Sequence, residues 1–339
     1  MKKLSAILCC SFFFWQIVRS QVTFPVNGPK EPKEYFTVFK NAVLHMSPGS
    51  TVNNGMLIIR QEKIIYAGPA KEIPEGSVVY DLQGYHIYPS FIDPYSQWGM
   101  PEVKKEDKPR FYPQMISDKK GPYNWNEAVK PETHAVEIFV AEEKTAESLR
   151  KYGFGSVVTH QQDGIIRGTS AFVLLGERPE NKLIVNPHAS LHFSFKKGSS
   201  SQDYPSSQMG SIALIRQTLY DAQWYKNTND IKEYNYSLDQ LNRYLHLPAV
   251  FEADNKWEIF RSEKIAKEFS LNAIYCGSGD EYQRLKELKK FGVKLILPLN
   301  FPEPFKINDP YELDKVDLAD LKHWELASFN PALLESYGI

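Results

Sequence analysis

Three side chains that can bind metal ions follow predicted β-strands in the second half of the sequence: Glu252, Asp254 and Cys276. Carboxylates and a thiolate are ligands for divalent cations, and groups at the carboxyl ends of parallel strands gather on one face of a barrel. The same side chains can instead form a hydrogen-bonded polar cluster without a metal. We favour the metal-free cluster and keep the metal site as the alternative.

Histidines add little to this set. His160 ends the predicted strand at residues 156–159 on the same face, and we place it with Asp93 and Asp254 in a possible pocket. A single histidine is more often structural than a ligand. His188 and His192 have the spacing of a ligand pair on a helix, but their surroundings predict strand and loop. We therefore interpret that spacing as incidental.

Other chemistries have weaker support. The sequence contains no Gly-x-Ser-x-Gly nucleophile elbow and no Walker-type phosphate loop. The formal net charge of the 339 residues is −1, so no basic surface predicts binding to nucleic acid or to acidic lipid. Aromatic side chains near the long loop suggest a cleft for a ring or sugar ligand: Tyr95, Trp98, Phe111, Tyr112, Tyr123 and Trp125.

Residues 1–20 are predicted to be a secretory signal peptide. Lys2 and Lys3 precede an apolar run of residues 4–18, and small residues precede a cleavage point after Ser20. The run is too short for a membrane-spanning helix, so we expect no transmembrane segment after cleavage. Cleavage leaves Cys276 as the one cysteine and excludes an intrachain disulfide. The protein is thus predicted to be exported, to the periplasm or the extracellular space.

The remaining chain divides into a linker and two domains. After a linker at residues 21–34, residues 35–89 hold short β-rich runs separated by turn signals, which predict a small β-sandwich domain or an open barrel of hairpins. From about residue 135, predicted helices alternate with predicted strands, which is typical of a parallel sheet and of a (β/α)8 barrel. The predicted helices are 135–151, 209–224, 257–269 and 281–290; the strands are 156–159, 171–175, 249–251, 273–275 and 293–297. Residues 99–133 and 198–207 are predicted loops.

Residues 36–97 resemble the N-terminal part of the amidohydrolase superfamily, near its imidazolonepropionase-related members. The likeness lies in Asn54-Gly-Met-Leu-Ile-Ile, Lys63-Ile-Ile-Tyr-Ala-Gly, Val79-Tyr-Asp-Leu-Gln-Gly and Pro89-Ser-Phe-Ile-Asp93. Further matches are residues 153–159 and 247–253. The resemblance implies a (β/α)8 barrel at residues 90–339 and hydrolysis of non-peptide carbon–nitrogen bonds in small amide or cyclic substrates. It also implies a divalent, zinc-like metal that activates water.

Carried over position by position, the resemblance places no histidine at a metal-ligand position. The His-x-His places hold Tyr95 and Gln97, the strand-five place holds Glu252, and the strand-six place holds Cys276 or Gly277. Residues 330–339 resemble the stretch before the eighth strand, so we expect an incomplete barrel that lacks its last strand.

Two functions follow as alternatives. The first is a metal-dependent amidohydrolase with unconventional ligands, and the second is a non-catalytic binding or scaffolding domain that binds no metal. In the second case the domain is expected to serve a longer protein whose active domain lies downstream, or to form a homo-oligomer.

Overall fold

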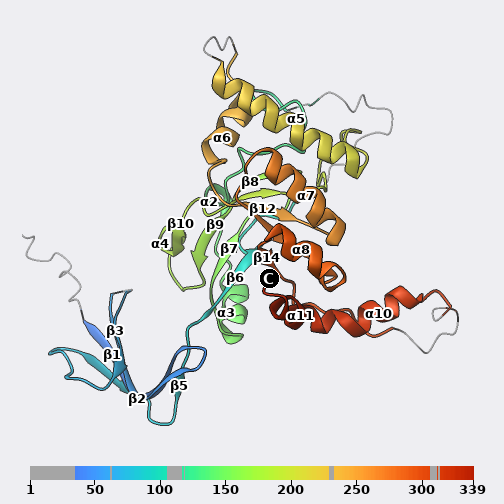
Figure 1. Cartoon of the computed structure of the whole chain (residues 1–339). Coiled ribbons are helices and arrows are strands. Elements are labelled where there is room, and N and C mark those ends of the chain that lie inside the picture. The colour runs from blue at the N-terminus through green and yellow to red at the C-terminus, as the bar shows by residue number, and fades with distance from the viewer. Residues whose placement is uncertain are drawn as a thin grey trace, which may run out of the picture. The chain divides into compact units, whose positions relative to one another are not determined.

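The computed structural model describes residues 35–61, 63–104, 117, 119–228, 233–305, 311 and 314–339. The predicted signal peptide, the linker, and part of the predicted loop at 99–133 lie outside these residues. The chain divides into two compact units, Met1–Pro89 and Ser90–Ile339 (Figure 1). None of the described helices is long and apolar enough to cross a membrane.

The described part of the first unit is one five-stranded sheet. Its order is β3-β2-β1-β4, and the short β5 pairs with the far end of β1. Alternate residues of β1 and β2, with Val38 and Ile58 among them, are buried in a small core. The second sheet of a sandwich is not among the described residues, so the sandwich stays a prediction. The bounds are β1 Phe36–Ser47, β2 Ser50–Arg60, β3 Lys63–Pro69, β4 Val78–Asp81 and β5 His86–Ile87.

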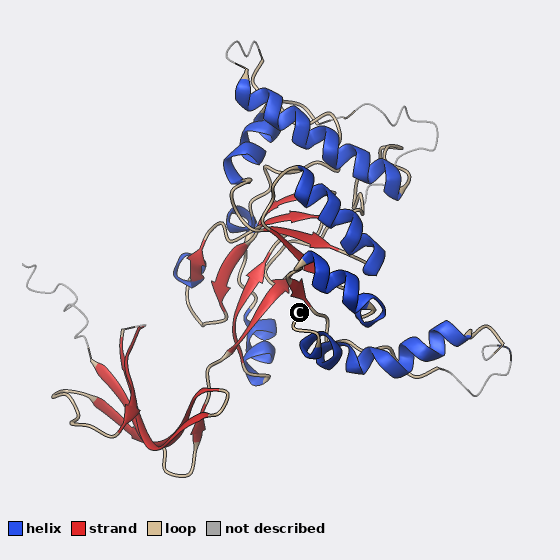
Figure 2. Ribbon diagram, in the orientation of Figure 1, coloured by secondary structure: helices blue, strands red, loops and turns tan. Residues whose placement is uncertain are grey.

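The second unit contains two sheets with helices around them (Figure 2). One sheet has the order β10-β9-β7-β6, and the other has the order β14-β13-β12-β11-β8. The strands are β6 Phe91–Ser96, β7 Phe154–Thr159, β8 Ile166–Thr169, β9 Ala171–Leu174, β10 Ile184–Asn186, β11 Leu191–Phe193, β12 Ala249–Glu252, β13 Ala273–Cys276 and β14 Leu295–Ile296.

Every described α-helix of this unit except α10 buries at least one apolar side chain. Ser207 caps α5 by accepting a hydrogen bond from the Gly210 amide, and Ile215, Leu219 and Ala222 form a buried apolar stripe along this helix. The α-helices are α2 Ala135–Ile138, α3 Glu143–Lys151, α4 Glu180–Leu183, α5 Gln208–Asn227, α6 Tyr236–Tyr244, α7 Lys256–Glu268, α8 Leu285–Phe291, α10 Leu318–Leu326 and α11 Asn330–Ser336; the 3-10 helices are η1 Glu281–Arg284 and η2 Ala327–Phe329.

The predicted alternation of helices and strands is confirmed from α5 onward, with α6 as an additional helix that was not predicted. Strands β11, β12, β13 and β14 pair in parallel, with α7 between β12 and β13 and with η1 and α8 between β13 and β14. Strand β12 begins Ala-Val-Phe with all three residues buried, as expected for a strand covered on both faces. Strands β6 and β7 are also parallel.

Residues 135–193 depart from the predicted alternation. The predicted helix at 135–151 is two helices, α2 and α3, because the buried Phe139 has an extended backbone. After β7, the chain forms the strands β8 to β11 with one four-residue helix, α4, among them. Strand β9 runs antiparallel to β7, and β8 runs antiparallel to β11. Positive φ angles at Gly164 and Gly168 break this stretch into short strands that leave no room for longer helices.

Gly168 marks the closest backbone approach in this region. Its φ is +76°, and a Cβ atom there would lie 1.9 Å from the Thr133 carbonyl oxygen. Two bridges, Val129–Ile166 and His134–Thr169, hold the end of the long loop against β8. Only glycine fits this position, so Gly168 determines where β8 and its side chains lie.

Replacing Gly168 by alanine should lower the free energy of unfolding by about 3 kcal/mol or more, from left-handed strain plus overpacking. Gly292 is a matched control, since its φ is +65° and no atom lies within 4 Å of a Cβ there. Gly292→Ala should cost only the strain, about 1 kcal/mol. Chemical denaturation of both variants measures the difference, and equal losses would contradict the close approach.

Candidate functional site

A buried polar cluster lies where strands from distant parts of the chain converge. Tyr95 is at the end of β6, His160 directly follows β7, His192 is in β11, and Glu252 and Cys276 end β12 and β13. The Tyr95 hydroxyl donates a hydrogen bond to Glu252 Oε2 over 3.2 Å. The structure therefore brings together residues 157 positions apart, at the strand ends where the resemblance places an active site.

The centre of the cluster is Arg167, which the sequence reasoning did not select. Its side chain is 3% exposed. Arg167 Nη1 lies 2.5 Å from Glu252 Oε2 and donates a 3.2 Å hydrogen bond to the Tyr95 hydroxyl, while Nε donates to the Gly164 carbonyl over 3.0 Å. One signal in the sequence was available: Arg167 follows two isoleucines and precedes glycine, and such a setting suggests a buried, paired charge.

A second cation occupies the other oxygen of Glu252. Lys196 Nζ lies 3.0 Å from Glu252 Oε1 and 2.6 Å from Asp254 Oδ1. Burial opposes ionisation of Glu252, but Arg167 and Lys196 outweigh burial and lower the pKa of this carboxyl group. Burial raises the pKa of the Tyr95 phenol, which therefore stays protonated and donates to Glu252.

Two stacked histidines form the other side of the cluster. The rings of His160 and His192 lie 3.6 Å apart between centroids with an interplanar angle of 17°, and the Tyr95 ring contacts both. Ser190 Oγ lies 2.9 Å from His192 Nε2. Both nitrogens of His160 and Nδ1 of His192 have no hydrogen-bond partner among the described residues. Burial is the main reason that the pKa of each imidazole is well below its ordinary value, so both rings are neutral.

The other predicted site residues lie around this cluster in different roles. Asp93 accepts a hydrogen bond from the Tyr95 amide over 3.0 Å, and Gln97 is exposed. Burial raises the pKa of the Cys276 thiol to about 12, and the nearby Glu252 carboxylate adds to this effect. Cys276 is thus a thiol at neutral pH, and Asp254 pairs with Lys196.

The His188 and His192 side chains belong to different networks. His188 Nδ1 lies 3.0 Å from Thr169 Oγ1, and the Tyr244 hydroxyl lies 3.2 Å from His188 Nε2. The strands β10 and β11 on either side confirm that their i,i+4 spacing is not helical. The predicted aromatic cleft is not assembled either: Trp98 packs on Phe139, Tyr123 on Tyr236 and Trp125 on Tyr204, while Phe111 and Tyr112 lie outside the described residues.

The residues present do not fit the divalent metal that the resemblance implies. Within the described ranges, no three His, Cys, Asp or Glu side chains are grouped so that they could hold a metal ion. The Arg167 guanidinium already occupies the Glu252 oxygen that would face a cation. The lone pairs of His160 and His192 lie in the planes of two nearly parallel rings, so they cannot point to one ion.

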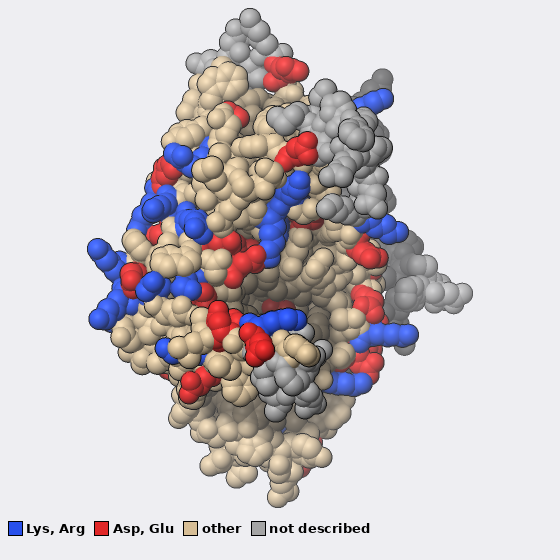
Figure 3. Space-filling view, turned by 90° about the vertical axis from the view of Figure 1, so that its right-hand side faces the viewer, with Lys and Arg blue, Asp and Glu red and all other residues tan. Residues whose placement is uncertain are grey.

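On the face seen in Figure 3, acidic and basic side chains are interspersed around a central hollow. The cluster has the same mixed character, with the carboxylates of Glu252 and Asp254 beside the cations of Arg167 and Lys196. Such a site offers hydrogen-bond donors and acceptors together.

The neutral histidines predict a specific loss of stability in acid. An unfolded chain takes up a proton at each histidine below pH 6.5, whereas His160 and His192 stay neutral when folded, so stability falls as the pH drops below 6.5. His160→Phe keeps the stacking and should make this slope smaller by one proton, about 1.4 kcal/mol per pH unit. Denaturation at a series of pH values measures the slope. An unchanged slope would show that folded His160 takes up the proton.

Comparison with known proteins adds to this geometry. No protein-family model matches the sequence, and no curated protein matches it. A crystal structure of an amidohydrolase from Thermotoga maritima is similar, with 20% identity, a TM-score of 0.62, and coverage of 89% of this chain and 84% of that chain.

Two other solved structures have TM-scores below 0.5. A prolidase complexed with N-methylphosphonate-L-proline is 11% identical over 90% of this chain and 76% of that chain, with a TM-score of 0.44. A D-hydantoinase (dihydropyrimidinase) from a Thermus species is 10% identical over 89% and 76%, with a TM-score of 0.30. The likeness to the Thermotoga protein establishes the fold: this chain has the fold of the amidohydrolases.

Proposed function

We propose that this chain is an amidohydrolase-like protein whose strand-end site binds a small amide or cyclic molecule and does not hydrolyse it with metal-activated water. The observation that carries the proposal is the position of Arg167. Its guanidinium group is bound to Glu252 and Tyr95, where the resemblance places the metal centre.

Arg167 supplies charge but not the chemistry of a metal ion. Metal-dependent hydrolysis needs a cation that lowers the pKa of a coordinated water. A guanidinium group neutralises Glu252 but has no open coordination position and does not lose its proton in proteins. The Tyr95 phenol and the Cys276 thiol both have raised pKa values, so neither is an ionised base or nucleophile at neutral pH.

The polar groups of the cluster match an amide ligand. An amide accepts through its carbonyl oxygen and donates through its N–H group. Lys196, 53% exposed at its side chain, is a donor that a ligand can reach, and Asp254, 48% exposed, is an acceptor beside it. Three nitrogens of the histidine pair have no hydrogen-bond partner among the described residues, and they offer a neutral donor and acceptor deeper in the cluster.

A metal-dependent carbon–nitrogen hydrolase is the second candidate. The observation in its favour is the fold itself, since the similar solved structures are named amidohydrolase, prolidase and dihydropyrimidinase. If the chain is such a hydrolase, its metal needs ligands other than the residues of the cluster around Arg167 and Glu252.

Three further proposals concern the fold of the second unit, the location of the protein and its partners. Two sets of parallel strands, β6-β7 and β11-β12-β13-β14, support an incomplete (β/α)8 barrel after the small β domain. We further propose that the protein is exported, and that the domain works with a downstream domain or with a second copy of itself.

Metal content separates the two candidates. Protein purified without chelators should contain metal far below one ion per chain by elemental analysis. It should not hydrolyse dipeptides or cyclic amides, with or without added zinc or manganese. Stoichiometric metal, together with hydrolysis that is lost in Glu252→Gln, would overturn the proposal in favour of the hydrolase.

Replacing Arg167 tests whether its guanidinium group acts as a cation bound to Glu252. Arg167→Ala removes the buried cation beside Glu252 Oε2 and leaves the half-exposed Lys196 as the remaining cation paired with this carboxylate, which should cost about 3 kcal/mol. Millimolar methylguanidinium should raise the Tm of this variant by refilling the cavity, and zinc should not.

The control is Arg150→Ala, which removes an arginine paired with Glu143 and Glu177 at the surface and should cost less than about 1 kcal/mol. Methylguanidinium should not raise the Tm of the wild type or of this control. Stabilisation of Arg167→Ala by zinc instead would show that the cluster is a latent metal site.

A further inference from the structure

Helix α10 carries an apolar stripe that is exposed among the residues that the structure describes. Leu318, Leu321 and Trp324 are spaced three residues apart and are 67%, 47% and 45% exposed. No residue of α10 is buried. Leucine and tryptophan side chains along one helix face are the usual anchors of a helix that binds in a groove.

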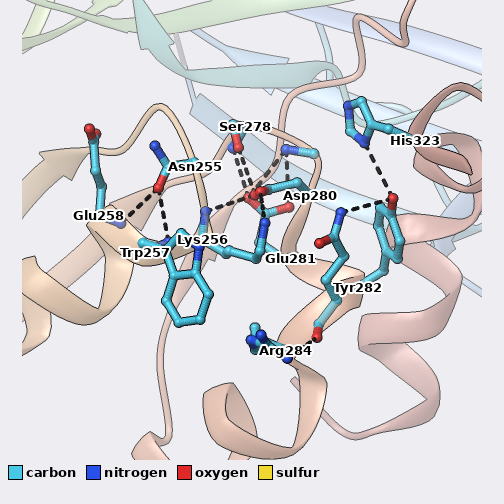
Figure 4. Close-up of polar contacts among 12 residues, drawn as sticks. Asn255, Lys256, Trp257, Glu258, Ser278, Asp280, Glu281, Tyr282, Arg284 and His323 are labelled. Atoms are coloured by element: carbon cyan, nitrogen blue, oxygen red, sulfur yellow. Dashed lines mark hydrogen bonds and ion pairs between the residues drawn. The ribbon is translucent and has the colours of Figure 1, made fainter. Parts of the chain in front are cut away.

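The opposite face of α10 contacts η1. The His323 ring stacks on Tyr282, and the Tyr282 hydroxyl lies 3.4 Å from His323 Nδ1 (Figure 4). His323 is two residues from Leu321, about 200° around the helix, so this contact directs the stripe outward. At the start of α11, Asn330 donates to the fully buried Glu281 over 2.7 Å and anchors the segment.

A groove of complementary character lies between α7 and α8. Its volume is about 630 Å³, and its apolar surface comes from Trp257, Phe260 and Phe291. Arg284, the last residue of η1, also lines the groove, and its guanidinium lies 4.8 Å from the centroid of the Trp257 ring (Figure 4). All lining residues belong to α7, η1 and α8, so α10 of the same chain does not occupy this groove.

The charges of the helix and the groove are opposite. The groove is lined by four basic side chains, Arg261, Lys264, Lys267 and Arg284, against Glu263 and Glu287, which gives +2. Helix α10 with its N-cap carries Asp317, Asp320 and Glu325 against Lys322, which gives −2. Opposite charge around an apolar contact favours docking and fixes its direction.

We propose that the α7–α8 groove binds helix α10 of a second copy of this chain. The helix supplies an apolar stripe and an acidic charge that complement the groove, and α10 of the same chain does not line that groove. In a twofold dimer each copy gives one helix and receives one, so both contacts form together. The surface is small, and the dimer is expected to be weak, with a dissociation constant in the micromolar range.

Sedimentation equilibrium of the whole chain over a range of concentrations tests the dimer. Wild type should show a reversible monomer–dimer equilibrium that weakens as salt is added. Leu321→Asp should abolish the dimer without loss of folding, because this side chain is exposed. The matched control is Tyr152→Asp, at a 75% exposed aromatic outside the proposed surface, which should leave the equilibrium unchanged.

Charge reversal tests the pairing itself. Lys264→Glu in the groove and Glu325→Lys on the helix should each weaken the dimer by about tenfold or more, and the double variant should recover most of the loss. A wild-type chain that stays monomeric at every concentration would overturn the proposal. So would a dimer that neither Leu321→Asp nor Lys264→Glu weakens.

Discussion

The buried pair of Arg167 and Glu252 is the interaction on which the arrangement of the second unit depends. A guanidinium group that is 3% exposed must have acceptors for its donors, because a buried unpaired charge costs several kcal/mol. Glu252, Tyr95 and the Gly164 carbonyl provide them from three different segments. Gly168, next to Arg167, lets β8 approach the Thr133 carbonyl closely enough to position the side chain. A change in any of these segments therefore disturbs the others.

The same pair sets the protonation states around it. With Arg167 and Lys196 on its two oxygens, Glu252 is ionised, and the Tyr95 hydroxyl can donate to it only while protonated. The positive charge of Arg167 adds to burial in keeping His160 and His192 neutral. These assignments are mutually consistent without a metal, and a divalent cation would compete with the guanidinium for Glu252.

A second buried carboxylate organises the other end of this unit. Glu281 accepts hydrogen bonds from the Ser278 and Gly279 amides and from Asn330. This closes the loop after β13 and anchors the start of α11, and α10 is oriented from there. The two carboxylates thus have different partners, cations for Glu252 and neutral donors for Glu281, and they stabilise different parts of the same sheet edge.

The sequence alone predicted α5, β12, α7, β13 and the helical segment of η1 and α8, since the apolar pattern of each segment matches its burial. It predicted neither β11 nor α6. It also showed that Tyr95 and Gln97 stand where the resemblance expects histidines. Tertiary structure decided which polar residues meet. The antiparallel strands of residues 160–193 bring Arg167, Lys196 and His192 to the site. The pairing of these strands depends on close backbone approaches at glycines and on contacts with the end of the long loop. Local sequence patterns carry no information about such contacts, because the partners of a buried charge lie in segments that are distant in the sequence and meet only in the folded chain.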